Sequence, residues 1–174
     1  FIQDDLGEFR RPIEFPSLQE ISSLSVLLQG GDVPALLVCS EKEGMVGLSS
    51  MAGGRMGFPV NLAVPGEPLV AVAADLDGDG DLDAFCVQSG KIDAAVGTVP
   101  QHRLFANRGD GPFDDVTAAS GIAVSGYGMG VACGDYDGDG YTDLYVTRVG
   151  PNALLRNLGG GRFMEVTQAA GVGD

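Results

Sequence analysis

Two stretches of the chain carry acidic residues at alternate positions: the first loop, Asp75-Leu-Asp-Gly-Asp-Gly-Asp-Leu-Asp83, and the second loop, Asp135-Tyr-Asp-Gly-Asp-Gly-Tyr-Thr-Asp143. Each has carboxylates at positions 1, 3, 5 and 9 and glycines at positions 4 and 6. Ca²⁺ is a hard cation that takes about six to eight oxygen ligands, which alternate carboxylates on a tightly curled loop supply. Glycine lets the backbone adopt φ > 0 and wrap an ion without a Cβ clash. We predict a calcium site in each loop; a plain acidic turn is the alternative.

Position 7 is occupied by Asp81 in the first loop and by Tyr141 in the second. A residue at this position would offer its backbone carbonyl to the ion, so its side chain is free to vary. The acids within one loop would repel one another strongly if nothing neutralised them. We therefore predict that both loops need a cation.

The flanking residues decide which kind of calcium loop this is. Short apolar runs stand before and after each loop, and such runs bounded by Gly and Asp read as buried strands. They are 69–74 and 84–87 around the first loop, and 129–133 and 144–147 around the second. An EF-hand loop lies between helices and places its last ligand at position 12. We expect instead an ion in the hairpin that joins two strands.

The two loops belong to longer repeats. Asp75 and Asp135 lie 60 residues apart, and the similarity continues beyond the loops, since residues 102–122 match residues 152–172. Each unit reads as strand, calcium loop, strand, link, strand, Gly-rich turn, strand and short connector. Four antiparallel strands in about 50 to 60 residues make one blade of a β-propeller.

A third, degenerate unit precedes these two. We expect its strands at 25–28, 34–38, 45–48 and 58–62, and residues 29–33 replace the calcium loop with almost no acids. The chain is therefore predicted to be all-β, with about three four-stranded antiparallel blades of a larger propeller, since about four to eight blades close a ring. The predicted divisions are 1–17 (outer strand of a preceding blade), 18–66 (blade without a calcium loop), 67–122 and 123–174 (calcium-binding blades).

Composition excludes several classes of function. The net charge is −14, which argues against nucleic-acid binding because that requires a basic face. No apolar run is long enough to span a membrane. The chain begins at Phe1, so we expect a mature, excised or partial chain. We expect the three cysteines, Cys39, Cys86 and Cys133, to be free buried thiols, with a disulfide or reactive thiol as the alternative.

Residues suited to catalysis are few. His102 is the only histidine and starts a predicted strand, where we expect a structural or solvent-facing role. With a single histidine, the chain has few of the residues that a histidine-based zinc site or a Ser-His-Asp triad needs. The glycine clusters at 109–111 and 159–161 occupy equivalent turns and match no nucleotide-binding motif. We expect no catalytic residues and no organic cofactor.

The repeats resemble the FG-GAP/VCBS family, whose members form integrin-α-type β-propellers, and are closest to the subgroup found in cartilage acidic protein and bacterial ASPIC/UnbV-type proteins. The marks are the loop motifs, the Asn-x-Gly-x-Gly-x-Phe turns and Val166-Thr-x-Ala-Ala-Gly171. The resemblance implies an often seven-bladed propeller with calcium in its hairpins. The implied calcium ligands are Asp75, Asp77, Asp79, Asp83, Asp135, Asp137, Asp139 and Asp143, with the carbonyls of Asp81 and Tyr141.

The resemblance implies a non-catalytic extracellular, cell-surface or periplasmic module for adhesion, scaffolding or binding of a protein or glycan. The remaining blades, from the same or another chain, are a further expected partner. Two alternatives stay open at this point: the propeller part of a carbohydrate-active enzyme of the lyase or dehydratase type, and a structural subunit of a larger complex. Fold resemblance alone does not decide between them, because propellers host many functions.

Overall fold

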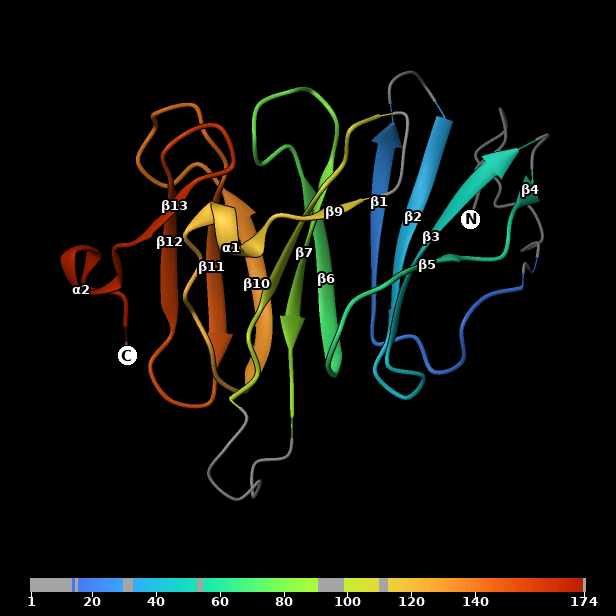
Figure 1. Ribbon diagram of the computed structural model, residues 1–174, viewed down its shortest axis with the longest axis horizontal. Coiled ribbons are helices and arrows are strands. Elements are labelled where there is room, and N and C mark those ends of the chain that lie inside the picture. Colours follow the sequence, from blue (N-terminus) through green and yellow to red (C-terminus); the bar gives the residue numbers. More distant parts are fainter. Residues whose placement is uncertain are drawn as a thin grey trace, which may run out of the picture.

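The computed structural model describes residues 14, 16–29, 33–52, 55–90, 99–109 and 113–173. They form three antiparallel sheets that stand side by side in chain order (Figure 1). The all-β prediction and the four-stranded blades are confirmed. The outer strand of a preceding blade is predicted within residues 1–17. Of these residues, 1–13 and 15 lie outside the described ranges.

The N-terminal blade consists of the four principal strands of the first sheet, with a short additional strand paired to one end of β3. Its elements are β1 (Ser23–Gln29), β2 (Val33–Ser40), β3 (Met45–Ala52), β5 (Val60–Leu62) and the additional β4 (Arg55–Met56). These strands overlap all four that the sequence predicts. Of residues 29–33, which replace the calcium loop, 30–32 lie outside the described ranges.

The middle and C-terminal blades repeat one plan of four strands and a one-turn helix. The middle blade consists of β6 (Pro68–Ala74), β7 (Asp83–Gln88), β8 (Arg103–Ala106), β9 (Asp114–Asp115) and α1 (Thr117–Ser120). The C-terminal blade consists of β10 (Gly128–Gly134), β11 (Asp143–Arg148), β12 (Ala153–Asn157), β13 (Phe163–Glu165) and α2 (Thr167–Ala170). The described part of the chain contains no helix long and apolar enough to cross a membrane.

The correspondence between these two blades extends to details of pairing. The register shifts at the same place in both, between Pro68 and Val70 and between Gly128 and Gly130. The one-turn helices are also held alike. Thr117 Oγ1 accepts the N–H of Leu104, and Thr167 Oγ1 accepts the N–H of Leu154, both at 2.9 Å. The two blades therefore share one local design.

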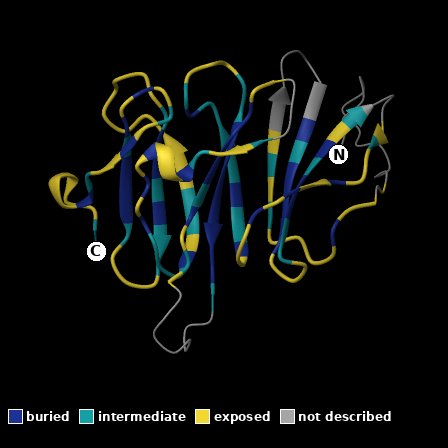
Figure 2. Ribbon diagram, in the orientation of Figure 1, coloured by how far each residue is buried: buried dark blue, intermediate teal, exposed yellow. Residues whose placement is uncertain are grey.

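The apolar core lies between neighbouring sheets, and β7 contributes to both of its halves. Successive strand residues point to opposite faces. Ala84 and Cys86 accordingly pack in a cluster with Leu37 of the N-terminal blade, whereas Phe85 and Val87 pack in a cluster with Leu144 of the C-terminal blade. All residues of β7 are buried (Figure 2). Burial of each large apolar side chain contributes about 1.5–3 kcal/mol, so the sheets stabilise one another.

One expectation about a single residue is wrong, and one left open between two alternatives is decided. Cys39 and Cys86 are free and buried as predicted, but Cys133 is exposed, because β10 emerges from the core at its loop end, where Ala132, Cys133 and Gly134 are all exposed. His102 is completely buried, which selects the structural alternative. Its Nδ1 accepts the N–H of Gln88 at 3.1 Å, and burial lowers its pKa to about 4.

Candidate metal centre

The two acidic loops join the first and second strands of the middle and C-terminal blades, at the same end of the sheets (Figure 1). Their glycines lie in the left-handed region, with φ of 86° and 94° at Gly78 and Gly80, and 76° and 91° at Gly138 and Gly140. No atom lies close enough to contact an added Cβ at these positions. Glycine is therefore required by the backbone angle and not by crowding.

The aspartate at position 1 folds each loop around its own carboxylate. Asp75 accepts the N–H of Gly78 at 2.7 Å and of Gly80 at 3.2 Å. Asp135 accepts the N–H of Gly138 at 2.8 Å and of Gly140 at 2.9 Å. Aspartate favours such local bonds to backbone that lies just ahead in the chain.

The aspartate at position 9 anchors each loop to the sheet, and both side chains are 1% exposed. Asp83 accepts the N–H of Leu76 and of Asn107, each at 2.9 Å. Burial, reinforced by the charges of Asp77 and Asp79, raises the pKa of Asp83 to about 6, although the two N–H donors oppose the shift. A buried carboxylate with this pKa would gain from a neighbouring cation.

Asp143 repeats this arrangement in the second loop. It accepts the N–H of Tyr136 at 2.9 Å and of Asn157 at 2.7 Å. In each blade the donors come from the loop and from the end of the third strand. The position-9 carboxylate therefore ties the hairpin to the strand beside it.

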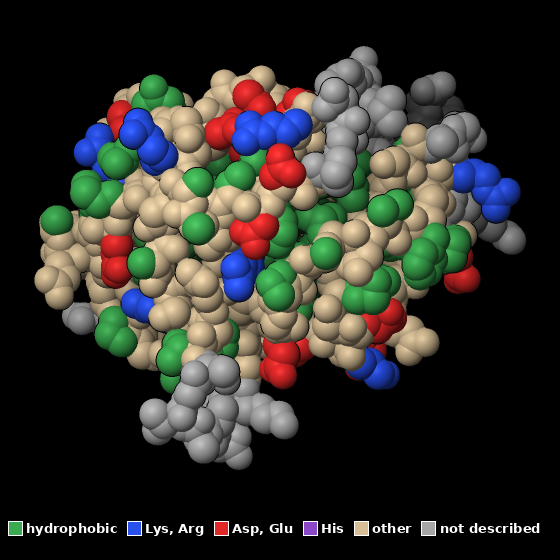
Figure 3. Space-filling model, viewed as in Figure 1, with side chains coloured by type: hydrophobic (Ala, Val, Ile, Leu, Met, Phe, Trp, Pro, Cys, Tyr) green, Lys and Arg blue, Asp and Glu red, His purple; other side chains and the backbone are tan. Residues whose placement is uncertain are grey.

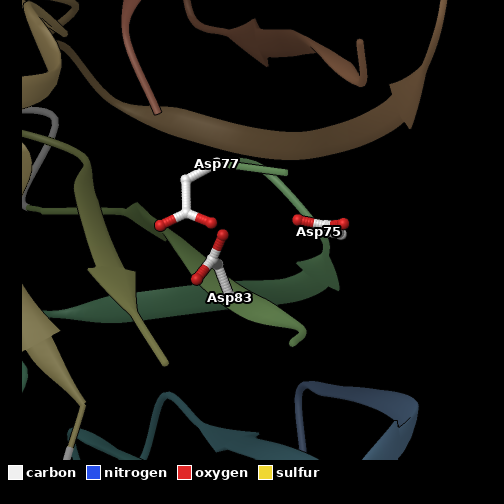
Figure 4. A group of neighbouring side chains, drawn as sticks. All are labelled: Asp75, Asp77 and Asp83. Atoms are coloured by element: carbon white, nitrogen blue, oxygen red, sulfur yellow. The ribbon is translucent and has the colours of Figure 1, made fainter. Parts of the chain in front are cut away.

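The folded loops bring together three carboxylates each. Oxygen atoms of Asp75, Asp77 and Asp83 lie within 4.8 Å of one another, and the same holds for Asp135, Asp137 and Asp143. Figure 4 shows the carboxylates of Asp77 and Asp83 facing each other, with Asp75 across the loop. Three converging hard oxygen donors fit a divalent cation such as Ca²⁺, whose remaining ligands would come from carbonyls and water.

The position-5 carboxylates of Asp79 and Asp139 do not join these groups. Each accepts the N–H of the position-7 residue instead, Asp79 from Asp81 at 2.9 Å and Asp139 from Tyr141 at 3.0 Å. Asp81 directs its own carboxylate toward the turn at Gly109. That Asp79 and Asp139 bind the ion, and that Asp81 and Tyr141 offer their carbonyls, stays a prediction.

Arginine side chains reach both loops, which the sequence analysis missed. Arg108 Nη1 lies 3.3 Å from Asp77 Oδ2. Arg156 Nε lies 2.7 Å from Asp137 Oδ2, and its Nη2 lies 2.9 Å from Asp139 Oδ2. The N–H of Tyr141, together with Arg156, lowers the pKa of Asp139. Figure 3 shows basic side chains beside acidic ones at this end of the molecule.

Asn107 and Asn157 also donate hydrogen bonds to the loops, and the sequence analysis did not identify them. Asn157 Nδ2 donates to the carbonyl of Thr142 in the second loop at 3.0 Å and to that of Leu76 in the first loop at 2.9 Å. Asn107 Nδ2 donates to the carbonyl of Leu82 in its own blade at 3.3 Å. Their shared place at the start of each Asn-x-Gly-x-Gly turn is a signal that could have identified them.

The C-terminal blade supports the first loop in a second way. A Cβ added to Gly161 would lie 3.2 Å from Asp77 Cβ, so the turn of one blade lies against the loop of the other. A pocket of about 130 Å³ lies beside this contact, with Asp77, Asp83 and Arg108 in its wall. Residues of two blades therefore contact the first loop, whose tip at residues 78–80 stays exposed.

Comparison with known proteins confirms the resemblance seen in the repeats. Residues 88–146 match the model of the FG-GAP-like repeat family. Cartilage acidic protein 1 from Mus musculus is 32% identical over 99 residues, which cover 52% of this chain and 15% of that protein. The matched region is therefore a small part of the relative. Residues 88–146 are thus similar to FG-GAP-like repeats, and the described blades have the four-stranded antiparallel architecture that the repeats predict.

Proposed function

We propose that this chain of FG-GAP-type blades is a calcium-stabilised segment of an extracellular β-propeller that binds a protein or a glycan. One observation carries the calcium part of the proposal. Two hairpins, 60 residues apart in sequence, each converge three carboxylates to within 4.8 Å with the same backbone hydrogen bonds. Such repetition is expected of an ion site and not of unrelated acidic turns.

Calcium would neutralise the loop carboxylates, including buried Asp83 and Asp143. Asp75 and Asp135 would hold the loop backbone in shape, and the position-9 aspartates would connect the ion to the third strand. Because an ion bound only by the folded state adds to stability, calcium at about 100 times its Kd would add about 2.7 kcal/mol per site. The role of the metal is structural.

The inference of an extracellular location rests on the proposed kind of calcium site and on the relative. Extracellular calcium modules bind with Kd of about 10⁻⁴–10⁻³ M, which suits calcium levels outside cells. The name of the mouse relative refers to cartilage and to acidity, and this chain is likewise acidic, with a net charge of −14. We infer the same kind of setting for this chain.

A contact surface for the partner is available beside the second loop. Tyr136 and Tyr141 are 47% and 45% exposed. Exposed tyrosines suit recognition because they present a large apolar ring and a polar hydroxyl. An acidic surface with aromatic residues would take a basic protein segment or a glycan.

The test is a thermal melt after exhaustive chelation, with calcium then titrated in and the sites counted by calorimetry. We expect two sites and a Tm that rises with calcium. Asp77→Ala and Asp137→Ala should each remove one site. Glu67→Ala, which changes an exposed acid outside the loops, should remove neither. A protein that binds no calcium and melts at the same temperature throughout would refute the proposal.

A further inference from the structure

The two loops differ in the basic side chains that reach them. Arg156 contacts two carboxylates of the second loop, at positions 3 and 5. Its equivalent in the middle blade is Ala106, and Asp79, at position 5 of the first loop, has no ion pair with a described residue. Arg108 contacts only position 3 of the first loop and also lies 3.9 Å from Asp114, outside the loop.

Arg156 places its guanidinium against carboxylates that an ion in the second loop would also contact. Asp137 belongs to the group of converging carboxylates, and its Oδ2 is the atom that faces Arg156 Nε. The Oδ2 of Asp139 faces Nη2, so the guanidinium spans both acids. One guanidinium thus places its positive charge beside both carboxylates, with a hydrogen bond to Asp139 and an ion pair to Asp137.

We propose that Arg156 is a tethered counter-cation of the second loop, which neutralises Asp137 and Asp139 without metal and weakens calcium binding there relative to the first loop. The inference rests on the proposed function, since it assumes that calcium binds both loops. An ion that enters the second loop must displace the guanidinium from Asp137 or share that carboxylate with it. Repulsion between Arg156 and a divalent ion acts in the same direction.

The expected size of the effect follows from exposure. The side chains of Arg156, Asp137 and Asp139 are 36%, 23% and 25% exposed, so water screens the pairs partly. Exposed pairs of this kind are individually weak, and two of them together with ion repulsion give about a five- to tenfold change in affinity. Arg156→Ala should therefore tighten calcium binding at the second loop by about that factor.

The experiment measures calcium affinity by calorimetry in an Asp75→Ala background, which disables the first loop. Arg156→Ala is compared with Arg156→Lys and with Arg162→Ala. Arg162 is exposed, belongs to the same blade and forms no ion pair with a described residue, so its removal changes net charge alone. We expect Arg156→Ala to bind most tightly, Arg156→Lys to be intermediate, and Arg162→Ala to match the parent.

A second measurement covers the case in which the background variant does not fold. Terbium can replace calcium, and nearby tyrosines sensitise its luminescence. All four tyrosines lie between residues 127 and 145, and Tyr136 and Tyr141 are within the second loop. The first loop is the same in all of these proteins, so differences in terbium titration between the parent and the Arg156 variants report on the second loop. The order of affinities among the variants should be the same.

The outcomes separate the inference from the proposed function. In chelator, Arg156→Ala should lower Tm by about 2–4 °C, whereas Arg162→Ala should not. Unchanged or weaker calcium binding by Arg156→Ala would overturn the competition. If the parent binds no calcium, the proposed function fails, and the melt in chelator still decides whether Arg156 neutralises the loop.

Discussion

The first and second loops have nearly the same sequence but different surroundings. Leu76 in the first loop is 1% exposed, whereas its counterpart Tyr136 in the second loop is 47% exposed. The neighbouring blade explains the difference, since Asn157 and Gly161 reach across to the first loop. The loop sequence thus sets the backbone shape, and the next blade sets how strongly that shape is held.

The largest expected difference between the middle and C-terminal blades is in their response to acid. His102 and its counterpart Asn152 make the same kind of hydrogen bond. Each accepts a backbone N–H of the second strand of its blade, from Gln88 and from Arg148 respectively. Only His102 can be protonated. Its pKa falls to about 4 in the folded protein, because of burial and then of the charge of Arg148, from about 6.5 when unfolded.

The folded state therefore binds fewer protons, and the stability contributed by neutral His102 is present above pH 6.5 and is lost as pH falls toward 4. At pH 5 the loss is about 2 kcal/mol. Urea unfolding between pH 7.5 and 5 should show this loss as a difference between the parent and His102→Asn, which copies the C-terminal blade, because the opposite contribution of Asp83, whose pKa is raised, is common to both proteins. Equal pH dependence in both proteins would contradict the assignment.

The next effect concerns the two asparagines. Asn157→Ala removes donors to both loops and the acceptor for the N–H of Gly159, and should cost about 2 kcal/mol. Asn107→Ala removes equivalent bonds within its own blade but none between blades, and should cost about 1 kcal/mol. Urea unfolding in excess calcium measures both. Equal costs would mean that the hydrogen bond between Asn157 and Leu76 adds nothing to the free energy of unfolding.

The smallest effect is expected at the glycine turn beside the first loop. Gly160 and Gly161 both have positive φ, 63° and 68°, so alanine at either position carries a similar backbone cost of about 1–2 kcal/mol. Only at Gly161 would the new Cβ crowd Asp77. We expect Gly161→Ala to weaken calcium binding at the first loop a few-fold and Gly160→Ala to leave it unchanged, as measured by calorimetry.

The sequence was sufficient to predict features that depend on neighbouring residues. Apolar runs and the repeat predicted the strands and blades, and the Asp and Gly pattern predicted loops that bring Asp75, Asp77 and Asp83 together. Arg156 could not be found in this way, because it reaches Asp139 from a different strand, 17 residues further along the chain.

Burial was also harder to predict where it depends on the neighbouring sheet. Cys133 lies in an apolar run like that of the middle blade, yet it is exposed, because its end of β10 leaves the core. His102 is polar and yet completely buried beside Phe85. In both cases the surroundings of the residue come from parts of the fold that local pattern does not specify.

The bond from Asn157 to Leu76 has a consequence for recombination. A blade cut out between α1 and β10 takes the first loop with it but leaves behind the asparagine that fixes this loop. The segment that has to be exchanged as one piece is therefore a loop together with the third strand of the blade that follows it. We call this piece a junction. Chimeras that exchange junctions should keep both acidic loops bonded to the asparagines that hold them, whereas chimeras that exchange whole blades should lose the bond from Asn157 to the first loop.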